Sequence, residues 1–311
     1  MGNVRSRMIK SVHYIEQDPG LIWIKDPQIA IDLDTPLDSL RILTPNVVRL
    51  PKGGFRMYYT GLGSNRTFEE SIGYILSAFS TDGLHWRKDP GVRMDVHVPD
   101  AMLRVLCPDV IPLPDGRWRM YYEARVKDLP TIVLSAISED GLAWQREPGV
   151  RMADPKWSFG TPRCLYVESP DDAPDRLRYR LYFHHYSYPL QAGLDKQNHI
   201  ISAVSDDGLQ FEIEPGVRIA QESAERESSA VYAPEVVRLG DGSYRMYYSG
   251  WSEKIQGGIF SATSSDGLNW KKDPGPLLEL DRPLDCQMVS EPCVIKLDDG
   301  RCRMFYEAED I

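Results

Sequence analysis

Apolar and polar residues along this chain alternate in short runs that are separated by tight turns. In one such unit a proline opens an apolar run at Pro108, a turn follows at Asp115-Gly116, and an aromatic run ends at Tyr122. Alternation on both sides of an Asp-Gly turn is typical of a β-hairpin. β-branched and aromatic residues dominate these runs, and no window keeps a helical period. The pattern therefore predicts an all-β chain. The same hairpin unit recurs over residues 45–59, 162–183, 234–248 and 292–306.

Four of the five hairpins are followed by a further apolar run and by an Asp-Gly-Leu phrase that leads into an aromatic residue, and Gly20-Leu21 leads into Trp23 in the same way. The aromatic positions lie 63, 58, 67 and 59 residues apart and are Trp23, Trp86, Trp144, Phe211 and Trp270. This period is too long for a helical solenoid and fits a four-stranded propeller blade with loops. We therefore predict a five-bladed β-propeller with four antiparallel strands in each blade. The aromatic rings should pack between adjacent sheets, and the turn aspartates should cap their own backbone.

The two ends of the chain carry complementary halves of one repeat. Residues 8–12 and 20–27 resemble a third and a fourth strand with no hairpin before them, whereas residues 293–306 form a hairpin with nothing after it. We expect one domain over residues 1–311. In it, residues 1–30 would supply the outer strands of the last blade and residues 286–311 its inner strands. Such a closure removes an exposed sheet edge.

Composition narrows the class of partner. The 311 residues carry a formal net charge of -10, which disfavours nucleic acid and anionic lipid as ligands. The five cysteines are odd in number and show no metal-binding spacing. No apolar run has the length of a signal peptide or a membrane span. We expect a cytoplasmic protein that acts on a small molecule, and its oligomeric state stays open.

The candidate catalytic and binding residues lie at the end of the repeats where the connections are long and varied. The residues beside the inner-strand prolines and at the ends of the second strands should converge there, and at these positions the repeats stop resembling one another. The candidates at this end are Asn46, Asp109, Glu123, Arg125, Arg163, His184, His185, Glu235, Trp251, Glu291 and Glu307.

Several carboxylates at one mouth cannot all ionise at low cost. One of them should therefore have a raised pKa and be able to donate a proton near neutral pH. Cleavage of a glycosidic bond needs such an acid and usually a second carboxylate. The alternative is that Arg163 or Arg125 neutralises the acids in a polar lining. No spacing requires a cofactor or a metal, and an axial ion held by carboxylates, histidine and water stays an open alternative.

Three phrases resemble the inner strands of the five-bladed propeller glycosidases of family 43 and of families 32, 68 and 130. They are Cys107-Pro108-Asp109-Val110, Ala233-Pro234-Glu235-Val236 and Ser290-Glu291-Pro292-Cys293. The resemblance covers nearly the whole chain as architecture and these few residues as motifs. It implies that Glu291 is the general acid and that Asp109 or Glu235 tunes its pKa.

One part of the family pattern is missing, because no repeat has an Asp directly before its inner proline. The corresponding residues are Thr44, Cys107, Thr161, Ala233 and Glu291. The water-activating base would then be Asp109 or a loop acid such as Asp34, Asp100 or Asp154. The sequence predicts catalytic roles for Glu291, Asp109 and Glu235. It predicts substrate contacts for Arg163, His184, His185, Asn46, Glu123, Trp251, Arg125 and Glu307.

Three classes of function remain open at this stage, and the first is favoured. The first is a glycoside hydrolase or, if phosphate replaces water at a site built from Arg163, Arg125 and the histidines, a glycoside phosphorylase. The second is a sugar-binding propeller without catalysis. The third is a propeller enzyme with other chemistry on a small metabolite, in which His184 or His185 exchanges the proton.

Overall fold

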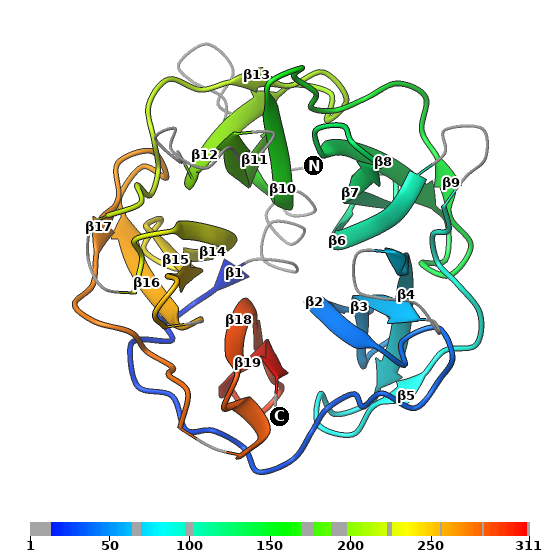
Figure 1. Ribbon diagram of the computed structural model, residues 1–311, viewed down its shortest axis with the longest axis horizontal. Helices are drawn as coiled ribbons and strands as arrows, with labels where there is room; N and C mark the ends of the chain where they lie inside the picture. Colours follow the sequence, from blue (N-terminus) through cyan, green and yellow to red (C-terminus); the bar gives the residue numbers. More distant parts are fainter. Residues whose placement is uncertain are drawn as a thin grey trace.

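The computed structural model describes residues 14–63, 70–96, 102–168, 177–187, 198–222, 226–255, 257–281 and 283–309. This part of the chain is almost entirely strands and connections, with one short 3-10 turn, η2 (Pro283–Asp285), and no α-helix among the described residues. The sheets stand radially around a common central axis (Figure 1). The prediction of an all-β chain built from several sheets is confirmed.

The strands follow the predicted hairpin-and-return order, and neighbours within a group are antiparallel. The first groups are β2 (Arg41–Arg49), β3 (Phe55–Gly63), β4 (Ile72–Ser80) and β5 (Arg87–Lys88), then β6 (Met102–Pro112), β7 (Trp118–Val126), β8 (Ile132–Ser138) and β9 (Gln145–Arg146). The next are β10 (Trp157–Glu168), β11 (Leu177–Ser187), β12 (Asn198–Ser205) and β13 (Glu212–Ile213). The last are β14 (Ala230–Leu239), β15 (Tyr244–Trp251), β16 (Ile259–Ser264) and β17 (Lys271–Lys272), followed by β18 (Met288–Lys296) and β19 (Cys302–Glu309).

The first strand of each group lies closest to the axis. These inner strands contact one another in a closed cycle: β2 touches β6, β6 touches β10, β10 touches β14, β14 touches β18, and β18 touches β2. Figure 1 shows the same order around the centre. Side chains at the starts of the inner strands are thereby brought together from distant parts of the sequence.

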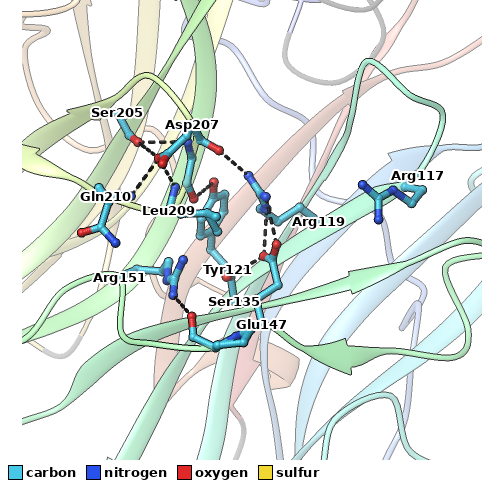
Figure 2. A network of polar contacts seen from close by, with 12 residues as sticks. Arg117, Arg119, Tyr121, Ser135, Glu147, Arg151, Ser205, Asp207, Leu209 and Gln210 are labelled. Atoms are coloured by element: carbon cyan, nitrogen blue, oxygen red, sulfur yellow. Dashed lines mark hydrogen bonds and ion pairs between the residues drawn. The ribbon is translucent and has the colours of Figure 1, made fainter.

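A tyrosine on the second strand of one sheet binds the main chain of the next sheet. Tyr58, Tyr121 and Tyr182 each donate a hydrogen bond of 2.8 Å to the carbonyl of a turn glycine in the following group. An arginine two residues earlier reinforces the contact. Figure 2 shows Arg119, which donates to the Asp207 carbonyl (3.0 Å) and pairs with Glu147 of its own sheet. The sheets are therefore latched to one another by buried hydrogen bonds as well as by apolar packing.

The hydrogen bond between the tyrosine and the turn requires glycine at the turn position for two separate reasons. Gly208 has a φ of 72°, a conformation that other residues adopt only with strain. A Cβ atom at this position would lie 2.7 Å from the Tyr121 hydroxyl and 2.3 Å from Nη1 of Arg119. The adjacent Asp207 accepts the amides of Leu209 and Gln210 (2.7 and 2.9 Å), so the prediction that this aspartate caps its own backbone is confirmed.

The recurring aromatic residues pack edge-to-face on an aromatic ring of the preceding sheet, which is a tyrosine except for Phe305 beneath Trp86. The ring centroids lie 5.8 Å apart for Trp144 on Tyr58 and 6.1 Å apart for Trp270 on Tyr182, with interplanar angles of 84° in both pairs. Phe211 makes the equivalent contact with Tyr121 at 5.7 Å. The predicted packing of these rings between sheets is confirmed.

The segment before β2 contacts both β15 and β19. Trp23 packs edge-to-face on Tyr247 at 5.7 Å, and Tyr247 donates to the Gly20 carbonyl at 3.1 Å. Arg303 pairs with Asp26 at 3.1 Å, as Arg119 pairs with Glu147 in the second group. Within the described residues β19 pairs only with β18, and a groove of about 1300 Å³ separates it from residues 22–33. The predicted strand at residues 8–12 lies outside the described residues.

One feature near the start of the chain was not predicted. The short strand β1 (Tyr14–Ile15) pairs in parallel with the end of β14. Ile15 is buried there in an apolar cluster with Val237, Leu239 and Val294. Burial of this side chain between two inner strands accounts for the pairing.

We predict that Trp23 contributes as much to stability as an aromatic residue in the middle of the chain. Trp23→Ala should lower the free energy of unfolding by about 2–4 kcal/mol, as should Trp144→Ala, because both remove a large ring from between two sheets. The neighbouring Ile22 is 90% exposed. Ile22→Ala should therefore change stability by less than about 0.5 kcal/mol. Denaturant unfolding measures all three variants, and a Trp23→Ala variant as stable as Ile22→Ala would contradict the prediction.

Candidate functional site

Every inner strand turns a strained corner directly before its proline. Thr44, Cys107, Thr161, Ala233 and Glu291 all have left-handed φ angles, between 45° and 56°. This conformation is rare for residues other than glycine and is disfavoured further for the residue before a proline. At each corner the pairing register of the hairpin also shifts. Strain of on the order of 1–3 kcal/mol per residue persists only where the surroundings hold it in place.

The backbone amides at these corners are bonded to neighbouring repeats. The amide of Cys107 donates to the Thr60 hydroxyl (2.9 Å), and that of Glu291 donates to the Ser249 hydroxyl (2.8 Å). The amide of Thr161 donates to Oε1 of Glu123 (2.5 Å). The second-strand end of one repeat thus supports the corner of the next.

The residues directly after the corner prolines form a buried layer that we call the axial ring. Its members are Asn46, Asp109, Arg163, Glu235 and Cys293. Asn46 accepts the amide of Val110 through Oδ1 (3.0 Å) and donates to Oδ1 of Asp109 (3.0 Å). These two hydrogen bonds join the inner strand β2 to the inner strand β6.

The axial ring takes in four of the residues predicted to contact substrate or perform catalysis. Asp109 and Glu235 are 0% exposed. Oδ2 of Asp109 accepts the Cys164 amide at 2.7 Å, and Oε1 of Glu235 accepts the Val294 amide at 3.0 Å. Burial raises the pKa of Asp109 to about 7 against the opposing effect of Arg163, and it raises the pKa of Glu235 in the same way. Asn46 and Arg163 are buried as well, at 0% and 3% exposure.

A second layer of acids lies at the corners themselves, and we call it the mouth cluster. It consists of Glu123, Glu291 and Glu307 with the adjoining Arg41, Thr44 and Cys107. Glu291 is 9% exposed and accepts a short hydrogen bond (2.5 Å) from the Thr44 hydroxyl. Glu307 accepts from Ser290 (2.7 Å) and from Nε of Arg41 (2.7 Å). The structure therefore brings the predicted Glu291 and Glu307 together.

Glu123 joins the same cluster from the opposite side. The thiol of Cys107 hydrogen-bonds the Glu123 carboxylate and lies 3.2 Å from the Thr44 hydroxyl. Two short side chains thus connect Glu123 to Glu291. Gly160 permits this approach, because a Cβ atom there would lie 3.0 Å from Oε1 of Glu123.

The acids of the mouth cluster favour the protonated form. Burial and then the charge of Glu291 raise the pKa of Glu307 to about 7. The pKa of Glu291 is raised by burial and by Glu123, against the opposing effects of Thr44 and Arg41. Burial also raises the pKa of Glu123. The carboxyl group of Glu307 therefore gains or loses its proton near neutral pH.

The remaining predicted residues lie around these acids with different surroundings. Burial lowers the pKa of His184 to about 3, and its Nε2 contacts Asn198, so this ring stays neutral. His185 stacks on Trp157 with centroids 4.4 Å apart. Trp251 is half-buried at the end of β15, and Arg125 is exposed near the end of β7.

Two of the loop acids proposed as the base are engaged elsewhere. Asp34 pairs with Lys88, and Asp154 accepts the amides of Lys156 (2.7 Å) and Trp157 (3.2 Å). Asp100 lies outside the described residues. Within residues 14–63, 70–96, 102–168 and the later described ranges, no group of three or more His, Cys, Asp or Glu side chains is placed to hold a metal ion.

Sequence reasoning missed Arg41, which pairs with Glu307 and also contacts Glu309 (3.2 Å). A signal was present, because Arg41 and Arg104 both stand four positions before a corner proline. The neighbouring repeat supplies a corner carboxylate. A basic residue at the start of an inner strand could therefore have been predicted to pair with that carboxylate. In the described part of the chain, no helix is both long enough and apolar enough to cross a membrane.

No protein-family model matches the chain. Among curated proteins, the uncharacterized protein Rv1502 of Mycobacterium tuberculosis is 37% identical over 139 residues, and the uncharacterized protein MT1551 of the same species is 29% identical over 139 residues. Each match spans 43% of this chain and 44% of the relative, which is less than half of either.

Solved structures of glycoside hydrolases and phosphorylases share the fold. A glycoside hydrolase superposes with a TM-score of 0.70 at 16% identity, covering 98% of this chain and 94% of its own. A thermostable family-43 glycoside hydrolase gives 0.66 at 18% identity, covering 85% and 83%. The β-1,2-mannobiose phosphorylase of Listeria innocua, solved with β-1,2-mannobiose, gives 0.66 at 14% identity, covering 86% and 87%. The resemblance to propeller glycosidases that the sequence implied is confirmed at the level of the fold.

We predict that stability falls as the pH rises through neutrality. The folded-state pKa of Glu307 lies above its unfolded value, so its contribution is present in full below about pH 4.3 and is lost as the pH rises through about 7. One such proton gives a slope of up to about 1.4 kcal/mol per pH unit. Glu307→Gln should flatten the decline between pH 5 and pH 8 in denaturant unfolding. Glu168→Gln, an exposed control on β10, should keep the wild-type slope. An unchanged slope in Glu307→Gln would contradict the prediction.

Proposed function

We propose that this protein is a glycoside hydrolase in which the mouth cluster performs acid/base catalysis on a small or oligomeric carbohydrate. The observation that carries the proposal is the meeting of Glu291 and Glu307 beside Arg41, with the pKa of Glu307 raised to about 7. A carboxyl group that holds its proton near neutrality can protonate the leaving oxygen of a glycosidic bond. The cluster stands where the long connections of a rigid scaffold meet, which is a usual place for a ligand.

In this proposal Glu291 and Glu307 share one proton and act as a pair. Glu291 is the more exposed of the two and is the one that reaches the substrate. Two neighbours set how firmly the proton is held, because the charge of Glu291 raises the pKa of Glu307 and Arg41 lowers the pKa of both carboxyl groups. Two interacting carboxyl groups titrate in two steps that belong to the pair.

Glu123 is the second carboxylate of the proposed reaction. Two side chains, Cys107 and Thr44, separate it from Glu291. An inverting reaction uses two carboxyl groups about 6.5–9.5 Å apart, which leaves room for an attacking water between them and the sugar. We therefore propose inversion at the anomeric carbon, with Glu123 as the base.

Asp109 and Glu235 take a supporting role in this proposal, although the sequence predicted them as catalytic. Their full burial and their bonds to the amides of Cys164 and Val294 favour the bracing of neighbouring corners over contact with a sugar. Asn46 belongs with them. His185 with Trp157, together with Trp251, offers aromatic surface near the mouth on which a sugar ring can stack.

We also propose that the chain is one five-bladed propeller whose last blade joins both ends. In this arrangement residues 1–30 supply the outer strands and residues 286–311 the inner ones. The contacts of Trp23 and Asp26 with Tyr247 and Arg303 support the placement of the fourth strand. The groove beside β19 has the place of a third strand.

Phosphorolysis is the second candidate for the reaction, because a phosphorylase is among the solved structures that share the fold. Of the residues proposed to hold phosphate, Arg163 is buried in the axial ring. Arg125 and the partly exposed Arg41 are the cations left at the mouth. A dependence of turnover on inorganic phosphate separates the two reactions.

The proposal predicts that turnover depends on Glu291. The substrates to test are p-nitrophenyl glycosides, arabino-oligosaccharides and β-1,2-mannobiose, each with and without inorganic phosphate. On any substrate that is cleaved, Glu291→Gln should lower kcat by about 10²–10⁴, because a general acid contributes a factor of this size. Glu123→Gln should lower kcat comparably.

Two controls make the result decisive. Glu168→Gln, on the exposed edge of β10, should keep wild-type kcat and KM. Asp109→Asn should lower the melting temperature, and it should lower the kcat of the folded protein much less than Glu291→Gln does. Binding of these sugars without turnover would contradict catalysis and favour a sugar-binding protein, and full activity in Glu291→Gln would remove the proposed acid.

A further inference from the structure

The axial ring follows one rule in most repeats, and the rule concerns hydrogen-bond acceptors. The side chain after the corner proline accepts the backbone amide of the next inner strand. Asn46 accepts from Val110 (3.0 Å) and Asp109 from Cys164 (2.7 Å). In the same way Glu235 accepts from Val294 (3.0 Å), and the Cys293 sulfur accepts from Val47 (3.3 Å).

Arg163 departs from this rule, because a guanidinium group has no acceptor. Its Nη1 donates to the Pro108 carbonyl (2.9 Å) and its Nη2 to the Pro45 carbonyl (3.0 Å). Its Nε donates to Oε2 of Glu235 (3.1 Å), and Nη1 lies 3.8 Å from Oδ1 of Asp109. Oxygen atoms from β2, β6 and β14 therefore converge on one positive charge contributed by β10.

This convergence has the character of a cation site. Backbone carbonyls and carboxylates are the ligands that Ca²⁺ prefers in proteins. The two carboxylates are buried without exposure, and isolated buried charges of this kind are costly unless they are paired. Arg163 is 3% exposed and keeps its charge, since Glu235 and Asp109 outweigh the effect of burial and raise its pKa.

The guanidinium also reaches the corners that carry the mouth cluster. Pro45 follows Thr44, whose hydroxyl binds Glu291, and Pro108 follows Cys107, whose thiol binds Glu123. Glu235, the third partner, holds the Val294 amide three residues after Glu291. One side chain thus braces three corners at once.

We propose that Arg163 is a built-in axial cation that fills an oxygen-lined site suited to a divalent metal ion and positions the proline corners. It is a positioning residue, because it acts through the corners and would not touch a substrate. The statement about the corners rests on the proposed function, whereas the cation site itself does not. It follows that removal of the guanidinium exposes an oxygen-lined site that binds a divalent cation.

The experiment uses the full-length protein and compares wild type with Arg163→Ala and Arg163→Gln. Melting temperatures are recorded in EDTA, in 5 mM CaCl₂, in 5 mM MgCl₂ and in 20 mM methylguanidinium chloride. Calcium binding is measured by titration calorimetry. Wild type should show the same melting temperature in EDTA and in CaCl₂ and should take up no calcium at the axis.

Arg163→Ala should melt at least 10 °C below wild type in EDTA and should regain at least half of this loss in CaCl₂ or methylguanidinium. It should bind one calcium ion per chain, and Arg163→Ala combined with Glu235→Gln should not. If Arg163→Ala does not fold in EDTA, Arg163→Gln, whose amide can still donate to one carbonyl, provides the same comparison. Variants that neither bind calcium nor regain stability with either cation overturn the proposal.

A further readout separates this inference from the proposed reaction. If a sugar is cleaved, calcium should restore the kcat of Arg163→Ala with little change in KM, because only the geometry of the corners is repaired. Calcium rescue of the melting temperature in a protein that cleaves no sugar would leave the axial cation intact and refute the hydrolase. Turnover by wild type, together with an Arg163→Ala variant that neither cation stabilises, would support the hydrolase and refute the axial cation site.

Discussion

The fold depends on hydrogen bonds at the proline corners that pass from one repeat to the next. A left-handed residue before proline cannot keep its amide in the strand ladder, and the neighbouring repeat supplies an acceptor such as Thr60, Ser249 or Glu123. Each corner is strained, and the strain persists only because adjacent repeats are locked together. Further from the axis, the bond from Tyr121 (Figure 2) to the Gly208 carbonyl and its counterparts at Tyr58 and Tyr182 also join adjacent sheets. A ring held in this way makes the positions around its centre rigid enough for chemistry.

The same constraint explains how the repeats can differ where they meet. An acceptor is all that the second-strand position must provide, so Thr60, Ser249 and Glu123 serve the structure equally well. A carboxylate at this position can therefore support the corner in the place of a hydroxyl group. Acids accumulate on one side of the axis, and their mutual burial raises their pKa values. The axial ring has a cation of its own, Arg163, which pairs with Glu235.

Much of the fold could be predicted from the sequence because each repeat is marked by a proline, an Asp-Gly turn and an aromatic residue at similar positions. The hairpins, the interleaved aromatic rings and the turn aspartates followed from local phrases, as Trp144 and Asp207 illustrate. The candidate site was predicted less well. The sequence alone placed all residues that flank the prolines in one pocket, whereas the corners sort them into a fully buried layer and a layer of glutamates that are 6–9% exposed. Asp109 and Glu235 fall into the buried layer. Arg41 and β1 were missed because their partners lie more than 200 residues away in the chain.

The central claim is that a sugar is held by the mouth cluster and that the axial ring below it is structural. A crystal structure of the protein soaked with a mixture of monosaccharides tests this claim most directly. The account predicts a sugar ring with Glu291 or Glu307 on one side and Glu123 on the other, and with no contact to Asp109 or Glu235. A ring bound away from these three glutamates, or one in direct contact with the axial carboxylates, would contradict it.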